Sequence, residues 1–115
     1  QPKFINIILE VKTTIKPINL LNVCNKIETQ LGRIRSKKND PRTCDIDIID
    51  YDQITFTSKG KNVLNLPHPG ICKRNFVLLP LFEISKTWKH PKSKVNIAEL
   101  LNLINIDDLR AIKQM

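Results

Sequence analysis

Hydrophobic residues recur with two different periods in the first third of the chain. Between positions 4 and 13, one side of the chain is aliphatic at every second residue: Ile5, Ile7, Leu9 and Val11. This alternation predicts a β-strand over 4–13. From Pro17 to Leu31 the apolar residues follow helical spacing, and Gly32 stands where a helix C-cap is expected. The pattern therefore predicts a strand and then an amphipathic helix over 17–31 that packs on a sheet.

The rest of the chain continues this mixture of strands and helices. Alternation of Asp and Ile predicts a strand at 45–49, and the pattern of residues 53–57 predicts another. The uniformly apolar run 76–82 is expected in the core, although Pro80 argues against a central strand there. Asn96 is expected to cap a helix that carries Ile97, Leu100, Leu101 and Ile104. Together these elements predict an α+β fold.

The segment richest in chemical groups is Pro41-Arg42-Thr43-Cys44-Asp45-Ile46-Asp47-Ile48-Ile49. Side chains alternate along a strand, so Asp45 and Asp47 share one face while the isoleucines take the other. Two carboxylates on one face, with the guanidinium of Arg42 nearby, suit a Mg²⁺ ion that binds phosphate groups. On the motif alone, an edge strand with solvated acids explains the pattern at least as well.

Size and charge limit the classes of function. The chain has 115 residues, which predicts a single domain over 1–115. Its net charge of +8 predicts anionic partners: nucleotides, nucleic acid or an anionic membrane. No apolar run approaches the length of a transmembrane helix, so a membrane protein is not expected. The three cysteines are widely spaced and support neither a zinc site nor a disulfide framework, so we expect reduced thiols in a cytoplasmic protein.

Five cations lie within ten residues just before the acidic pair: Arg33, Arg35, Lys37, Lys38 and Arg42. Such a run is typical of a solvated loop, but its position also fits a cationic flap over a polyphosphate. The run contains no aromatic residue, whereas nucleic-acid-binding surfaces usually interleave aromatic and basic side chains. Nucleic acid is therefore the less favoured anion.

Other candidate residues have a plain and a functional interpretation each. Phe4 and Asn6 share a strand face, either as exposed residues or as a stacking ring beside a hydrogen-bonding amide. Glu28 belongs either to the helix surface or to a binding site. His68 lies in a rigid Pro-rich loop, where histidines are usually surface residues, and Arg74 and Phe76 follow it.

Taken in order, these segments resemble the 6-hydroxymethyl-7,8-dihydropterin pyrophosphokinase family of folate biosynthesis. The resemblance covers residues 1–92 and is strongest at Lys38-x-x-Pro41-Arg42-x-x-Asp45-Ile46-Asp47-Ile48-Ile49. It also includes Gln1-Pro2-x-Phe4-x-Asn6, Glu28-x-x-x-Leu31-Gly32-Arg33-x-Arg35, Pro67-His68 and Arg74-x-Phe76-x-Leu78-x-Pro80-Leu81-Phe82-Glu83-Ile84. The resemblance implies a ferredoxin-like sheet with packed helices. It further implies transfer of an intact pyrophosphoryl group from ATP to the hydroxymethyl group of a pterin, which leaves AMP.

The resemblance also implies a role for each matched residue. Asp45 and Asp47 would hold two Mg²⁺ ions that bridge the ATP phosphates. The pterin ring would be bound by Phe4, Asn6 and Phe76. Charge in the transition state would be stabilised by Arg33 and Arg42, and ATP would be contacted by Glu28, Arg35, Arg42, Ile48, His68 and Arg74.

The chain departs from the family at its front. The family begins with a strand that carries a Gly-Ser-Asn-Leu-Gly-like motif, then a helix and a second strand, and none of these has a counterpart here. We therefore expect the C-terminal two thirds of the family domain, incomplete at the N-terminus. We expect a monomer that binds ATP and the pterin and binds neither nucleic acid nor a membrane. A basic nucleic-acid-binding module and an inactive truncated fragment are the alternatives.

Overall fold

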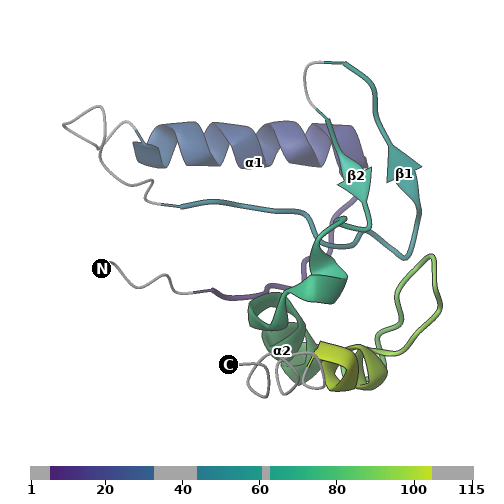
Figure 1. Cartoon of the computed structure of the whole chain (residues 1–115). Helices are drawn as coiled ribbons and strands as arrows, with labels where there is room; N and C mark the ends of the chain where they lie inside the picture. Colours follow the sequence, from purple (N-terminus) through teal and green to yellow (C-terminus); the bar gives the residue numbers. More distant parts are fainter. Residues whose placement is uncertain (1–5, 33–43, 61–62, 105–115) are drawn as a thin grey trace, which may run out of the picture. The chain divides into compact units, whose positions relative to one another are not determined.

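The computed structural model describes residues 6–32, 44–60 and 63–104. Figure 1 labels α1 (Pro17–Gly32), β1 (Phe56–Thr57), β2 (Asn65–Leu66) and α2 (Asn75–Ile84), and a short 3₁₀ helix, η1, spans Ile71–Lys73. Residues 97–104 form a further helix. The chain divides into two compact units, one made of Thr13–His68 and the other of Gln1–Lys12 with Pro69–Met115.

The Thr13–His68 unit is built on α1, which confirms the predicted amphipathic helix. Pro17 occupies the first helical position, where its missing N–H costs nothing, and the helix includes Gly32 as its last residue. Cys24 is the buried residue of this helix, with 8% of its surface exposed. After residues outside the described range, the extended segment 44–50 returns along α1 in the opposite direction (Figure 1).

A two-stranded antiparallel sheet closes this unit. β1 pairs with β2 in the register Phe56↔Leu66 and Thr57↔Asn65, which confirms the end of the strand predicted at 53–57. Ser58 extends the pairing, because its backbone N–H donates to the Leu64 carbonyl (3.0 Å) and its hydroxyl accepts from the Leu64 N–H (2.7 Å). Gly60 follows with φ of +116°, a conformation that glycine adopts without strain.

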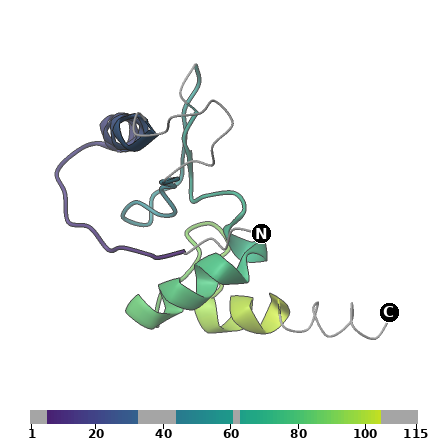
Figure 2. The same ribbon diagram turned by 90° about the vertical axis from the view of Figure 1, so that its left-hand side faces the viewer.

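The core of the second unit is formed by α2, η1 and the helix at 97–104. Figures 1 and 2 both show α2 beside that helix. The buried apolar side chains are Ile71, Val77, Leu78, Leu81, Trp88, Ile97 and Leu100. The expectation that all of 76–82 lies in the core is wrong, because the run is helical and only one helix face is covered. Phe76 and Leu79 are 47% and 52% exposed.

A turn at residues 88–97 leads into the last described helix. The Ile97 N–H donates to the Trp88 carbonyl (2.9 Å), and Lys89 pairs with Asn96 in an isolated antiparallel bridge. The side-chain oxygen of Asn96 accepts from the Glu99 N–H (2.9 Å), so the predicted N-cap is confirmed.

The α+β class is confirmed, but two predicted strands are not formed in the described residues. Residues 6–13 and 44–50 are extended without strand pairing. Alternation of apolar residues favours an extended backbone, yet a strand also needs a neighbour for its ladder, and the described residues supply none. In the first segment, Ile7, Leu9 and Val11 are 64–74% exposed. The ferredoxin-like order of strands stays a prediction.

None of the helices in the described ranges is long and apolar enough to cross a membrane.

Neighbouring leucines on α2 give a test of this packing. Leu78 is 0% exposed and Leu79 is 52% exposed. Leu78→Ala should lower the free energy of unfolding by about 2–5 kcal/mol, because it leaves a cavity in the core. Leu79→Ala, the matched control, should change it by about 0.5 kcal/mol or less. Urea unfolding followed by fluorescence of Trp88, the single tryptophan, measures both values. Equal losses for the two variants would contradict the assigned helix face.

Candidate functional site

Asp45 and Asp47 lie on the exposed side of the extended segment 44–50. Exposure alternates over 44–48: both aspartates are exposed, while Ile46 and Ile48 are half-buried. The predicted sharing of one face by the two acids therefore agrees with the burial pattern, although no strand ladder fixes it. Successive positions on one side of an extended chain are roughly 6–7 Å apart, a distance from which two carboxylate tips can reach one cation.

A backbone hydrogen bond connects His68 to this acidic segment. The His68 N–H donates to the carbonyl of Ile49, with 2.8 Å between N and O. The residues before His68 are firmly held, because Leu66 is 1% exposed and Pro67 is also buried. His68 itself is half-buried. The structure thus places His68 next to the segment that carries the two acids, although about twenty residues separate His68 from them in the sequence.

Glu28 belongs to the same unit and lies half-buried on α1. It is one helical turn from the buried Cys24, and it affects that thiol. Burial is the larger cause that raises the pKa of the Cys24 thiol, and the negative charge of Glu28 adds to it. Glu28 therefore presents a negative charge on the face of α1 that carries the buried thiol.

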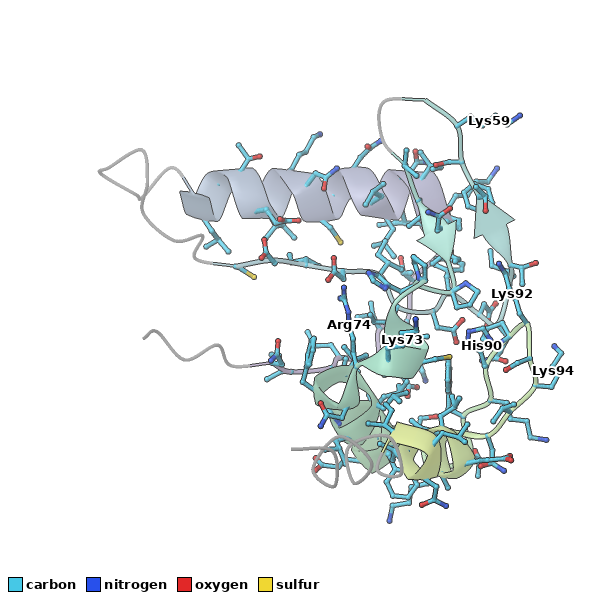
Figure 3. All side chains as sticks on the ribbon, in the orientation of Figure 1. Lys59, Lys73, Arg74, His90, Lys92 and Lys94 are labelled. Atoms are coloured by element: carbon cyan, nitrogen blue, oxygen red, sulfur yellow. The ribbon has the colours of Figure 1, made fainter. Side chains whose placement is uncertain are left out.

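Arg74 and Phe76 form a second group, in the other unit, at the start of α2. The guanidinium carbon of Arg74 lies 5.8 Å from the centre of the Phe76 ring, which is within the range of a cation–π contact. Figure 3 shows Arg74 and Lys73 projecting from the turn that precedes α2. Asn6 is exposed in the extended segment of the same unit.

Four predicted site residues lie outside the described residues: Phe4, Arg33, Arg35 and Arg42. The structure thus brings Asp45, Asp47, Ile48, His68 and Glu28 into one unit, and Arg74, Phe76 and Asn6 into the other.

The carboxylates of Asp45 and Asp47 suit a Mg²⁺ ion that takes its other ligands from a substrate. Within residues 6–32, 44–60 and 63–104 there is no group of three or more His, Cys, Asp or Glu side chains that would enclose a metal. Mg²⁺ is usually bound by one or two carboxylates and by the phosphates of its substrate. An exposed pair such as Asp45 and Asp47 fits that arrangement.

Two residues with well-defined local contacts had no signal in the hydrophobic pattern. Gly70 lies directly beneath the Arg74 side chain. His90 holds the 88–97 turn, because its Nδ1 accepts hydrogen bonds from the N–H groups of Lys92 (3.1 Å) and Ser93 (3.3 Å). In Figure 3, Lys92 and Lys94 lie on the outer side of this turn.

Residues 1–86 match the family described as 7,8-dihydro-6-hydroxymethylpterin-pyrophosphokinase. The chain belongs to this family. The match includes every predicted site residue, from Phe4 to Phe76.

Relatives of the pyrophosphokinase family support this assignment. The chain is 39% identical over 84 residues to 2-amino-4-hydroxy-6-hydroxymethyldihydropteridine pyrophosphokinase of Bacillus subtilis, covering 73% of this chain and 48% of the relative. The protein of the same name in Haemophilus influenzae is 34% identical over 101 residues, covering 88% and 61%. The folic acid synthesis protein fol1 of Schizosaccharomyces pombe is 36% identical over 110 residues, covering 96% and 15%.

The chain spans about half the length of these bacterial relatives and a smaller share of the fol1 protein.

The raised pKa of Cys24 gives a test of the environment on α1. The rate of alkylation of Cys24 by iodoacetamide should rise with pH around a midpoint above the ordinary thiol value, because only the thiolate reacts. Glu28→Gln should lower this midpoint only in part, since burial is the larger cause. Mass spectrometry of the Cys24 peptide after timed quenching measures it.

Cys72 is the matched control, because burial alone raises the pKa of its thiol. Its midpoint should not respond to Glu28→Gln. Because the pKa of Cys24 is raised, the folded chain favours the protonated thiol, and this preference stabilises the fold. The stabilisation is fully present below the pKa of the thiol in the unfolded chain. It is lost as pH rises through the folded pKa. A Cys24 midpoint at or below the ordinary value would contradict the described burial.

Proposed function

We propose that the protein carrying this chain transfers a pyrophosphoryl group from ATP to 6-hydroxymethyl-7,8-dihydropterin. The supporting observation is that the exposed Asp45 and Asp47 pair lies within the 1–86 match to the pyrophosphokinase family. The Bacillus subtilis and Haemophilus influenzae relatives are named for this reaction.

The chemistry follows from transferring the β- and γ-phosphates together. The hydroxymethyl oxygen of the pterin forms a bond to the β-phosphorus of ATP. The bond from that phosphorus to the oxygen shared with the α-phosphate breaks, AMP leaves, and the hydroxyl proton is released. Such a reaction depends mainly on positioning and on cations at the developing charge, and it needs no covalent intermediate with the protein.

In this proposal the predicted residues have two tasks: some bind ATP with its metal ions, and others bind the pterin. Asp45 and Asp47 would hold two Mg²⁺ ions, which supply positive charge to the phosphates of bound ATP. His68, tied to Ile49 by its backbone, would contact the nucleotide beside them. Phe76 and Asn6, with Phe4, would hold the flat pterin by stacking and by hydrogen bonds to its edge.

The remaining predicted residues complete the nucleotide site in this proposal. Arg33 and Arg42 would stabilise charge in the transition state, and Arg35 would belong to the cationic flap. Glu28, Ile48 and Arg74 would line the ATP side. A single domain over 1–115, a monomeric state and a cytoplasmic location stay predictions. A nucleic-acid-binding module is not favoured, because the fol1 relative is named for folic acid synthesis and the bacterial relatives are named as pyrophosphokinases.

The metal role of Asp47 can be tested by binding. Mg²⁺-dependent affinity for a non-hydrolysable ATP analogue should fall about ten-fold or more in Asp47→Asn, since even residues that contact a metal only indirectly change its affinity by about 10–100-fold. Isothermal titration at two Mg²⁺ concentrations measures this affinity. The product of the complete gene is the protein to use, with turnover to AMP recorded in parallel.

Asp52→Asn is the matched control, because Asp52 is an exposed aspartate on the following turn and the charge change is identical. Its φ of +55° is also tolerated by asparagine. Equal losses in the two variants would show a general charge effect and would contradict the metal role. Mg²⁺-independent binding to mixed DNA that weakens steeply with salt would instead favour the nucleic-acid alternative.

A further inference from the structure

Gly70 has a backbone conformation that does not require glycine. Its φ is −91° and its ψ is 1°, which other residues also adopt in turns. It precedes η1, and the Lys73 N–H donates to its carbonyl at 3.2 Å. Backbone geometry therefore gives no reason for the absence of a side chain here.

The space that a side chain would take is filled by Arg74. A Cβ atom added to Gly70 would lie 2.9 Å from Nε, 3.1 Å from Cζ and 3.3 Å from Nη2 of Arg74. The guanidinium group thus lies against the bare α-carbon of Gly70. Arg74 is half-buried in this position.

The other partner of this guanidinium is the ring of Phe76. The distance of 5.8 Å from Cζ to the ring centre places the cation over the ring. Phe76 still exposes 47% of its surface, so part of its ring stays accessible to a ligand. Gly70, Arg74 and Phe76 form a row of contacts within a single compact unit.

We propose that Gly70 is a positioning residue: its missing side chain lets Arg74 fold back over the turn and hold the ring of Phe76 for the pterin. This inference rests on the proposed function for its ligand, but the contacts exist without it. Gly70 touches no substrate in this proposal and acts through Arg74 and Phe76.

Gly70→Ala separates this role from a contribution to stability. The added methyl group would meet the end of a flexible side chain and no backbone atom, so Arg74 would move and the fold would stay. Alanine also lowers the conformational entropy of the unfolded chain, so the free energy of unfolding should be unchanged or slightly higher. A structural role for Gly70 would instead appear as a loss of stability.

The first experiment measures the contact in the ligand-free chain by NMR. The Nε–H proton of Arg74 should show a ring-current shift from Phe76, identified by its loss in Phe76→Leu. The same loss is expected in Gly70→Ala, whereas Lys73→Gln, which removes a neighbouring cation, should keep the shift. An unchanged Arg74 signal in Gly70→Ala would overturn the proposal.

The second experiment is a double-mutant cycle on binding of 6-hydroxymethylpterin in the presence of Mg²⁺ and a non-hydrolysable ATP analogue. The analogue is saturating for every variant, because Arg74 is also placed on the ATP side. Gly70→Ala should weaken pterin binding about two- to five-fold, the effect of one exposed cation–π contact. In an Arg74→Gln background the same change should have no further effect, because the route through Arg74 is already lost. Equal effects in both backgrounds would overturn the proposal.

The two experiments fail in distinguishable ways. If the protein carrying this chain binds no pterin while the NMR shift behaves as expected, the proposed substrate is wrong and Gly70 still positions Arg74. If the pterin binds and the shift does not depend on Gly70, the proposed function stands and the positioning role is wrong.

Discussion

One backbone hydrogen bond, from the His68 N–H to the Ile49 carbonyl, connects two of the sequence segments proposed to bind the nucleotide. The acidic segment 44–50 is extended without a strand ladder in the described part of the chain. The bond from His68 therefore holds the backbone of this segment at Ile49. His68 follows directly on two buried residues: Leu66, the last residue of β2, and Pro67. This hydrogen bond therefore connects the segment of the acidic pair to the end of β2 in the small sheet.

The acidic pair carries negative charge in a chain that is positively charged overall. Two exposed carboxylates repel a polyphosphate, yet the chain as a whole carries a net charge of +8. A divalent cation would resolve this conflict, because it can bind both carboxylates and phosphates. The net positive charge of the chain would then favour the approach of an anionic nucleotide. Neither the acids nor the bases alone would serve this purpose.

The sequence predicted the parts of the fold that depend on local chemistry. Helix α1 follows from Pro17, the helical spacing and Gly32, and the cap at Asn96 follows from its side chain. The strands at 4–13 and 45–49 were not found in the described residues, because alternation sets an extended backbone while pairing depends on distant neighbours. For the same reason the exposure of Phe76 could not be derived from an apolar run, since a helix buries only one of its faces. The row formed by Gly70, Arg74 and Phe76 depends on side-chain packing, which no pattern in the sequence encodes.

In the proposed function, Asp45 and Asp47 together bind the Mg²⁺ ions that accompany ATP. A crystal structure of the protein with Mn²⁺ and a non-hydrolysable ATP analogue tests it most directly, because the anomalous signal of manganese locates the ion. Manganese is expected to be bonded to carboxylate oxygens of both Asp45 and Asp47 and to the phosphates. Manganese bound at other residues, or the two carboxylates directed to opposite sides of the segment, would contradict it.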